Sequence, residues 1–257
     1  AEWSIQFALR NTDFFNNLNF FFTDYKGFGE ISRKCYNTNL ENSDQHFVFL
    51  GSPEMEDFGK YFASEYEENL NKKRKSVMWA PRWKYHEIYG GSHFLEYKDN
   101  FTALRKKYPD LKLRFRPHRN LLDEMIKDKK MTEEEIKAYK DSLEENNIYL
   151  DEHDSLKHAF SESDIMISDM TTVIPIYFLT GNPIIYCPRI DPPQPWAGNS
   201  KLMEHAVYRA ENWEQVEKYL EMLLSGEDPL KDERRRIIKE MHKIHEGAAE
   251  RIVQYII

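Results

Sequence analysis

The chain has 257 residues, enough for one large domain or two small ones with a substantial hydrophobic core. Its 40% hydrophobic, 14% aromatic and 31% charged residues are typical of a globular protein. A net charge of −8 argues against a nucleic-acid-binding protein, although a local basic pocket for a small phosphorylated ligand remains compatible with it. Two distant cysteines, Cys35 and Cys187, form no disulfide framework, so a reducing, cytoplasmic setting is expected.

The first fifty residues contain an aromatic-rich segment followed by a polar one. The apolar run at 13–25 predicts a buried strand, a helix is expected near 31–36, and residues 37–45 are typical of a loop. A short strand at 47–50 ends on Gly51-Ser52-Pro53, a breaker that predicts a domain junction. The chain starts at Ala1 without a methionine, so we expect it to be a piece of a longer protein.

From residue 53 onward, predicted strands alternate with predicted helices. The strands are expected at 77–80, 111–115, 148–150, 165–167, 184–186 and 206–209. The helices are expected at 55–71, 100–107, 155–160, 171–179, 213–225 and 229–256. Two further charged helices are expected after the strand at 111–115, and the second of them opens with a capping box at 132–135. This alternation predicts an α/β fold, a Rossmann-like parallel sheet with helices on both faces. In such sheets ligands bind at the carboxyl ends of the strands.

The strongest candidate site is the turn Ser168-Asp169-Met170-Thr171-Thr172, which follows the apolar strand at 165–167. Free N–H groups and the positive end of the dipole of the next helix favour a phosphate there. The hydroxyls of Ser168, Thr171 and Thr172 add donors for the same oxygens. Asp169, being anionic, is expected to fix the turn. The alternative is that Ser168, Asp169 or Thr171 simply caps the helix.

A second candidate site follows the strand at 111–115. This strand delivers Arg116, Pro117 and His118 to the carboxyl edge of the sheet. A histidine in this position could bind a diphosphate or act as a general acid toward a leaving phosphate. The alternative is a surface histidine beside solvated arginines.

A third candidate site follows the strand at 77–80. Arg82 and Lys84 could complete a cationic clamp around a transferring phosphate. The alternative is that Trp79 packs in the core and the cations beyond it are solvated, and for Trp79 itself we favour the core.

Two charged clusters are assigned no catalytic role. Lys72–Lys75 is expected to be a solvated helix end, with a contact to a membrane surface as the weaker alternative. His242 and His245 have the spacing of a metal pair, but no third ligand accompanies them, so no metal site is expected.

Taken in order, these segments resemble the C-terminal half of the CDP-glycerol glycerophosphotransferase family, the teichoic-acid polymerases and primases. That family has a Gly-x-Pro junction, an Ala-Pro-Thr-Trp-Arg-like loop, a His-Pro-type strand end, a Ser-Asp-Tyr-Ser-Ser turn and a Pro-Ile-Ile-Phe-Tyr-like strand. The counterparts here are Gly51-Ser52-Pro53, Ala80-Pro81-Arg82-Trp83-Lys84, Arg116-Pro117-His118, Ser168–Thr172 and Pro183-Ile184-Ile185-Tyr186. The segment 246–251 is similar to the family's Asp-Gly-x-Ala-x-x-Arg ending, and the resemblance extends over residues 13–257.

The resemblance implies a two-domain GT-B fold. Residues 1–50 would be the tail of an acceptor-side half with its linker, and residues 51–257 a nucleotide-donor-binding Rossmann-like domain. The reaction would move glycerol phosphate or a similar polyol phosphate from a CDP-alcohol donor to a cell-surface polymer, a glycan or a lipid-linked acceptor, with CMP leaving. No cofactor, metal or nucleic acid would take part. The bacterial enzyme would work in the cytoplasm, and peripheral contact with the inner face of the membrane is an open option.

The resemblance also implies roles for the residues of the three candidate sites. His118 would be the catalytic residue at the donor diphosphate, and Asp169 would fix the turn. The donor phosphates would be held by Ser168, Thr171, Thr172, Arg82, Lys84 and Arg116.

Three departures from the family pattern leave other functions open. Ile176 occupies a position where the family has a carboxylate often assigned to the ribose, Pro117 precedes His118 instead of following a histidine, and the Trp-His-Gly-type motif with the catalytic base would lie ahead of Ala1. The alternatives are a nucleotide-sugar glycosyltransferase of GT-B architecture, and a non-catalytic nucleotide-binding module in which the Ser168 turn is only a helix cap.

Overall fold

The computed structural model describes residues 21–23, 47–84, 91–188, 196 and 198–257. Most of the strand predicted at 13–25, the helix predicted near 31–36 and the loop at 37–45 lie outside these residues. Among the described helices, none combines the length and the apolar character needed to cross a membrane.

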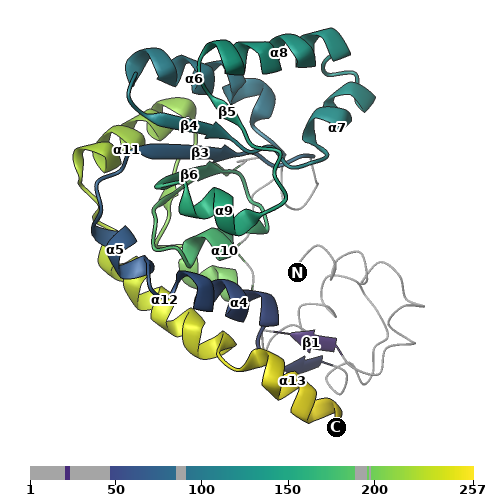
Figure 1. The fold of residues 1–257 in the computed structure, drawn as a ribbon, viewed down its shortest axis with the longest axis vertical. Helices are drawn as coiled ribbons and strands as arrows, with labels where there is room; N and C mark the ends of the chain where they lie inside the picture. Colours follow the sequence, from purple (N-terminus) through teal and green to yellow (C-terminus); the bar gives the residue numbers. More distant parts are fainter. Residues whose placement is uncertain (1–20, 24–46, 85–90, 189–195, 197) are drawn as a thin grey trace.

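The main body is built on one parallel sheet of six strands in the order β5-β4-β3-β6-β7-β8 (Figure 1). Their bounds are β3 Ser76–Ala80, β4 Lys112–Phe115, β5 Tyr149–Leu150, β6 Ile165–Ser168, β7 Ile184–Tyr186 and β8 Tyr208–Arg209. All five strand pairs are parallel. The strands β3, β6 and β7 are buried along their whole length, because helices cover both faces of the sheet.

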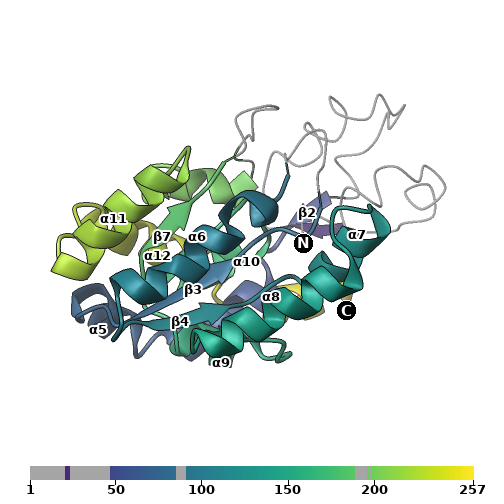
Figure 2. The ribbon, with the colours of Figure 1, turned by 90° about the horizontal axis from the view of Figure 1, so that it is seen from above.

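One face of the sheet is covered by α6 (Phe94–Lys107), α7 (Leu121–Lys127), α8 (Glu133–Glu145) and α11 (Trp213–Ser225), and Figure 2 shows α6, α8 and α11 across it. Trp79 is fully buried there and contacts the rings of Phe94, Phe101 and Phe115. The core role favoured for Trp79 is therefore confirmed.

The opposite face is covered by α4 (Pro53–Phe62), α9 (Leu156–Ser161), α10 (Val173–Phe178) and α12 (Lys231–His245). With helices on both faces of a parallel sheet, the predicted α/β Rossmann-like class is confirmed.

Two helices that the sequence predicts as continuous are broken. The segment predicted at 55–71 divides into α4 and α5 (Tyr66–Asn71). The segment predicted at 229–256 divides into α12 and α13 (Ala248–Ile256), because Glu246 leaves the helical region with a ψ of 126° and Gly247 then adopts a left-handed conformation with φ of 71°. By contrast, the predicted capping box of α8 is present, with Thr132 and Glu135 each bonding the other's backbone N–H.

A separate two-stranded parallel sheet, β1 (Phe21–Thr23) and β2 (Phe47–Phe49), lies beside α13 (Figure 1). Arg251 of α13 donates to the carbonyl oxygen of Leu50, and Tyr255 contacts Phe22 edge to face. The following Gly51 has a φ of 84°, and a Cβ there would lie 2.7 Å from the carbonyl oxygen of Ile244. The junction predicted at Gly51-Ser52-Pro53 is thus a tightly packed turn; the domain boundary itself stays a prediction.

Candidate functional site

Three loops of the candidate site begin at adjacent strand ends. Ala80 of β3 is in register with Ser168 of β6, and Trp79 is in register with Phe115 of β4. Because the three strands are parallel neighbours, the segments that follow them start at the same edge of the sheet. The topology therefore brings together the three loops that the sequence analysis singled out.

A cavity of about 450 Å³ opens at this edge. Four of the predicted site residues line it: Arg116, His118, Thr171 and Thr172. The other four predicted residues, Ser168, Asp169, Arg82 and Lys84, are not part of its lining. The remaining lining residues that carry polar or charged side chains are Arg119, Asp123, Lys140, Asp151, Glu152, His153 and Asp154.

His118 is an exposed residue, and two contacts orient its ring. Its Nδ1 accepts a hydrogen bond of 3.2 Å from the backbone N–H of Asn120, which assigns the proton of the neutral ring to Nε2. The ring stacks on Trp83 with 5.5 Å between centroids. Partial desolvation, and then the charges of Arg119 and Arg82, lower the pKa of His118 below its usual 6.5. A neutral imidazole that donates through Nε2 is therefore the expected form near neutral pH.

Arg116 is anchored by a carboxylate that the sequence analysis did not identify. Asp151, which follows β5 and is fully buried, lies 2.9 Å from Arg116 Nη1 and 2.7 Å from Arg114 Nη1. Burial raises the pKa of Asp151, but the hydrogen bond from Arg114 and the charge of Arg116 more than offset that, so the net shift is downward. Asp151 thus fixes the Arg116 side chain and neutralises part of its charge.

The Ser168–Thr172 turn divides into an inner and an outer part. Ser168 is fully buried, and its hydroxyl donates to the carbonyl oxygen of Ala80 at 2.6 Å. Thr171 is half-buried, and Thr172 is exposed at the start of α10 with no side-chain capping bond. Since α10 has only six residues, its dipole contributes little, and the Thr171 and Thr172 hydroxyls are the donors that the turn offers to the cavity.

The cations that follow β3 are committed to other partners. Arg82 is 4% exposed; its Nε donates to the carbonyl oxygen of Lys84, and its Nη1 donates to that of Met170. Lys84 forms an ion pair with Glu124 at 3.1 Å. Asp169 is buried and accepts from the backbone N–H of Arg82 at 2.9 Å, an arrangement that suits the turn-fixing role expected of it.

The chemistry of the lining changes across the sheet. The hydroxyls of Thr171 and Thr172 follow β6, and His118 follows β4. The exposed carboxylates of Glu152 and Asp154 follow β5, which lies on the far side of β4 in the strand order. A ligand spanning the cavity would therefore meet hydroxyl and imidazole donors at one end and, at the other, two carboxylates of which Glu152 is paired with Lys140 at 2.9 Å.

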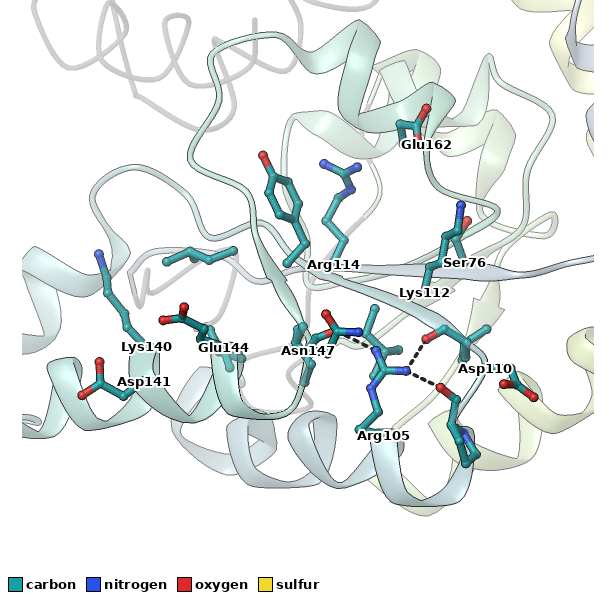
Figure 3. A pocket seen from close by; sticks show the side chains of 17 residues that line it. Ser76, Arg105, Asp110, Lys112, Arg114, Lys140, Asp141, Glu144, Asn147 and Glu162 are labelled. Atoms are coloured by element: carbon teal, nitrogen blue, oxygen red, sulfur yellow. Dashed lines mark hydrogen bonds between the residues drawn. The ribbon is translucent and has the colours of Figure 1, made fainter.

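A larger cavity of about 670 Å³ lies elsewhere, at the amino ends of β4 and β5 (Figure 3). Its central cation, Arg105, donates to the carbonyl oxygens of Asn146, Pro109, Leu111 and Asn147. These bonds tie the ends of α6 and α8 to the adjoining loops. Because Arg105 is fully engaged by the backbone, the smaller cavity at the carboxyl edge is the better candidate site.

Two buried residues near the site, Asp151 and His93, are not among those predicted from the sequence. Asp151 could have been found by the rule that identified His118, since it is the first residue after a predicted strand. His93, whose Nδ1 lies 2.6 Å from Asp169 Oδ1, directly precedes α6, but the sequence analysis placed the start of that helix near residue 100.

Within the part of the chain that the structure describes, no three or more His, Cys, Asp or Glu side chains form a group that could hold a metal ion. His242 contacts the ring of Tyr66, and His245 Nδ1 accepts from the backbone N–H of Ser52.

No family model matches the chain, and no curated protein matches its sequence. Solved structures do match. A variant of the wall teichoic acid polymerase TagF, after a 30-minute soak with CDPG, has a TM-score of 0.56 and 16% identity, covering 100% of this chain and 59% of that one. A second TagF variant has a TM-score of 0.58 and 16% identity over 98% of this chain and 59% of that one. A putative UDP-N-acetylglucosamine 2-epimerase from Listeria monocytogenes has a TM-score of 0.54 and 17% identity, covering 93% and 59%.

The fold is GT-B-like. Identities this low establish the architecture and nothing finer, and the chain spans only 59% of the length of each of these structures.

Proposed function

We propose that this chain binds a CDP-activated alcohol in the carboxyl-edge cavity and forms the donor half of a phospho-alcohol transferase. The observation that carries the proposal is the gathering of Arg116, His118, Thr171 and Thr172 around one cavity from two separate loops. A diphosphate needs several hydrogen-bond donors and positive charge at one place; these side chains supply the donors, and Arg116 supplies the part of its charge that Asp151 does not neutralise. A similar fold in a polymerase structure soaked with CDPG supports the same ligand class.

The order of groups across the cavity fits such a donor. Phosphate oxygens would lie beside Thr171, Thr172 and His118, while the hydroxyl-rich parts of the ligand would lie toward Glu152 and Asp154. Carboxylates accept hydrogen bonds from ribose or polyol hydroxyls and repel phosphates, so Asp154 favours this direction, while Lys140 balances the charge of Glu152. The volume of about 450 Å³ is also within the usual range for small-molecule sites.

The proposed reaction forms one P–O bond and breaks another. An acceptor hydroxyl oxygen attacks the phosphorus that bears the alcohol, and the bond from that phosphorus to the oxygen it shares with CMP breaks. CMP leaves with that oxygen, and the acceptor proton passes to a base that the family resemblance places ahead of residue 1. His118 would donate its Nε2 proton in a hydrogen bond to a diphosphate oxygen, so charge stabilisation and positioning would supply most of the catalysis.

The setting follows from the substrates of this proposal. A CDP-alcohol is a cytoplasmic metabolite, so we place the reaction on the cytoplasmic side, at the inner face of the membrane when the acceptor is lipid-linked. A polyol-phosphate or glycan acceptor would be bound by the acceptor-side half, of which residues 1–50 would be the tail.

Calorimetry with the full chain and CDP-glycerol tests the proposal. We expect measurable binding that CMP competes away, and an affinity about 10- to 100-fold lower in His118→Ala, the cost of losing a hydrogen bond to a charged group. His205→Ala, which removes an exposed histidine outside the cavity lining, is the matched control and should leave the affinity unchanged. Absence of binding for every cytidine nucleotide would overturn the proposal.

A second candidate is a nucleotide-sugar enzyme of the same architecture. It is favoured by the structural match to a putative UDP-N-acetylglucosamine 2-epimerase, and by Ile176, which is buried in the core instead of offering a carboxylate to a ribose. A thermal-shift panel of CDP-glycerol, UDP-N-acetylglucosamine and GDP-sugars separates the two. Stabilisation by the sugar nucleotides alone would select the second candidate, and binding without transfer in the full-length protein would indicate a non-catalytic module.

A further inference from the structure

A buried His–Asp pair lies beneath the candidate site. His93 Nδ1 is 2.6 Å from Asp169 Oδ1, and both side chains are almost completely shielded from solvent. The imidazole ring stacks on Tyr97 with 4.7 Å between centroids and an interplanar angle of 14°, and its Nε2 lies 3.9 Å from Glu96. Because Asp169 Oδ1 can only accept when ionised, Nδ1 of His93 is the donor in this contact.

Asp169 joins two segments that are distant in sequence. Its Oδ2 accepts from the backbone N–H of Arg82 at 2.9 Å and from that of His93 at 3.4 Å, while Oδ1 receives the imidazole. Arg82 returns a bond, from its Nη1 to the carbonyl oxygen of Met170. The loop after β3 and the turn after β6 are thus linked in both directions around one carboxylate.

The linked loop in turn supports the ring of His118. Trp83 directly follows Arg82, and its indole stacks on the imidazole of His118 at 5.5 Å and 23°. A continuous series of contacts therefore runs from His93 through Asp169 and the Arg82–Trp83 backbone to His118. On the other side of Asp169, the same turn carries Thr171 and Thr172 to the cavity.

We propose that His93 is a positioning residue that, through Asp169, fixes the orientation of His118 and of the two threonines. His93 does not line the cavity, so its effect must pass through these contacts. Removing the Nδ1–H donor would leave a buried carboxylate with one oxygen unsatisfied, and the Arg82–Trp83 segment would lose its anchor.

Two substitutions of similar size distinguish a positioning role of His93 from its contribution to core packing. In His93→Asn the side-chain amide nitrogen can occupy the place of Nδ1 and keep the bond to Asp169, whereas in His93→Gln the amide nitrogen reaches the place of Nε2. Both variants lose the aromatic stacking on Tyr97, so a difference between them reports the bond to Asp169 and not the lost ring. Thermal melting of both variants verifies that they fold.

The decisive measurement is an NMR titration of the His118 ring in the free full chain, with the exposed His205 as an internal reference. His118 faces Arg119 and Arg82, and its Nδ1 takes the N–H of Asn120, so its titration reports this local arrangement. We expect the His118 ring to titrate in His93→Asn as it does in the wild type. In His93→Gln we expect the His118 pKa to rise toward its ordinary value, because the Trp83 ring that covers one face of the imidazole moves away. Identical His118 titrations in wild type and His93→Gln would overturn the positioning role.

A second experiment measures CDP-glycerol affinity. It rests on the proposed function, unlike the ligand-free titration. CDP-glycerol affinity should fall about tenfold in His93→Gln and stay within about threefold of wild type in His93→Asn. If the wild-type chain binds no cytidine nucleotide, the proposed function fails, but the ligand-free titration still decides the role of His93. A titration that changes only in His93→Gln supports the inference in either case.

Discussion

The hydroxyls of Ser168 and Thr172 belong to one turn but face different surroundings. The buried Ser168 donates to the carbonyl oxygen of Ala80 at the end of the neighbouring strand β3, whereas Thr172 is exposed at the cavity. We therefore predict that Ser168→Ala lowers the free energy of unfolding by about 1–3 kcal/mol, because a buried carbonyl loses its donor, and changes CDP-glycerol affinity less than about twofold.

Thr172→Val is the matched substitution on the cavity side. It should leave the free energy of unfolding within about 0.5 kcal/mol of wild type, since the residue is exposed, while weakening CDP-glycerol binding about tenfold. For both variants, urea unfolding measures the free energy of unfolding and calorimetry measures the CDP-glycerol affinity. The opposite assignment, with affinity lost in Ser168→Ala and kept in Thr172→Val, would mean that Ser168 is the phosphate ligand after all.

Half of the site residues predicted from strand ends line one cavity. The others do not line it, and His93 is not predicted at all, for physical reasons. His118 and Thr172 line the same cavity because parallel strands deliver their following residues to one edge. The inward direction of Ser168 and the buried partners of Arg82 depend on the path of the loops, which residue type and spacing do not determine. His93 carried no local signal, because its partner Asp169 is 76 residues away.

Among the secondary-structure elements, the link between α4 and α13 offers a test by pH. Glu56 of α4 accepts from the backbone N–H groups of Gly247 and Ala249, at 2.9 Å and 3.0 Å, at the start of α13. A hydrogen bond from Lys60, then that from Ala249, lowers the pKa of Glu56 from 4.5 to about 2. A carboxyl with a lowered pKa contributes stability above its unfolded pKa, and that contribution is lost as pH falls from about 4.5 to about 2.

Glu56→Gln should accordingly lower the free energy of unfolding by about 1–2 kcal/mol at neutral pH, allowing for solvent screening. The difference from wild type should shrink as pH falls below about 4.5, and chemical denaturation across this range measures it. Lys60→Gln is the control. The Lys60 side chain is 70% exposed, so we expect a smaller effect than that of Glu56→Gln; equal effects would show that the surface ion pair, and not the cap on α13, holds the link.

The same elements show where sequence patterns succeed and where they stop. The six strands of the main sheet are predicted within a few residues because short apolar runs mark them, and the helix at 213–225 because its apolar residues recur at helical spacing. The breaks between α4 and α5 and between α12 and α13 were missed, since the residues around each break remain compatible with a helix. The second helix ends where Glu246 adopts a ψ of 126° and Gly247 a left-handed conformation, and a glycine inside a helical pattern does not by itself predict a break.

On the scale of the whole molecule, two hydrophobic clusters bear on the predicted 51–257 domain. Among the described residues, one cluster extends from Val77 to Leu223 and the other from Met55 to Met241. The cavity lining falls between Ala80 and Val173, so both the core and the candidate site lie within the predicted 51–257 domain. Arg251 and Tyr255 of α13 also contact Leu50 and Phe22, which precede the predicted boundary at Gly51.

We therefore predict that a fragment of residues 51–257 folds cooperatively and binds CDP-glycerol within about threefold of the full chain. A shorter fragment, 76–257, is the control: it lacks Met55, Phe58 and Phe62, which are buried against the face that carries α10 and α12, and should lose cooperative unfolding. Thermal unfolding and calorimetry on both fragments measure the outcome. If 51–257 fails to unfold cooperatively, residues 1–50 belong to the same folding unit, and the boundary at Gly51 is not a domain boundary.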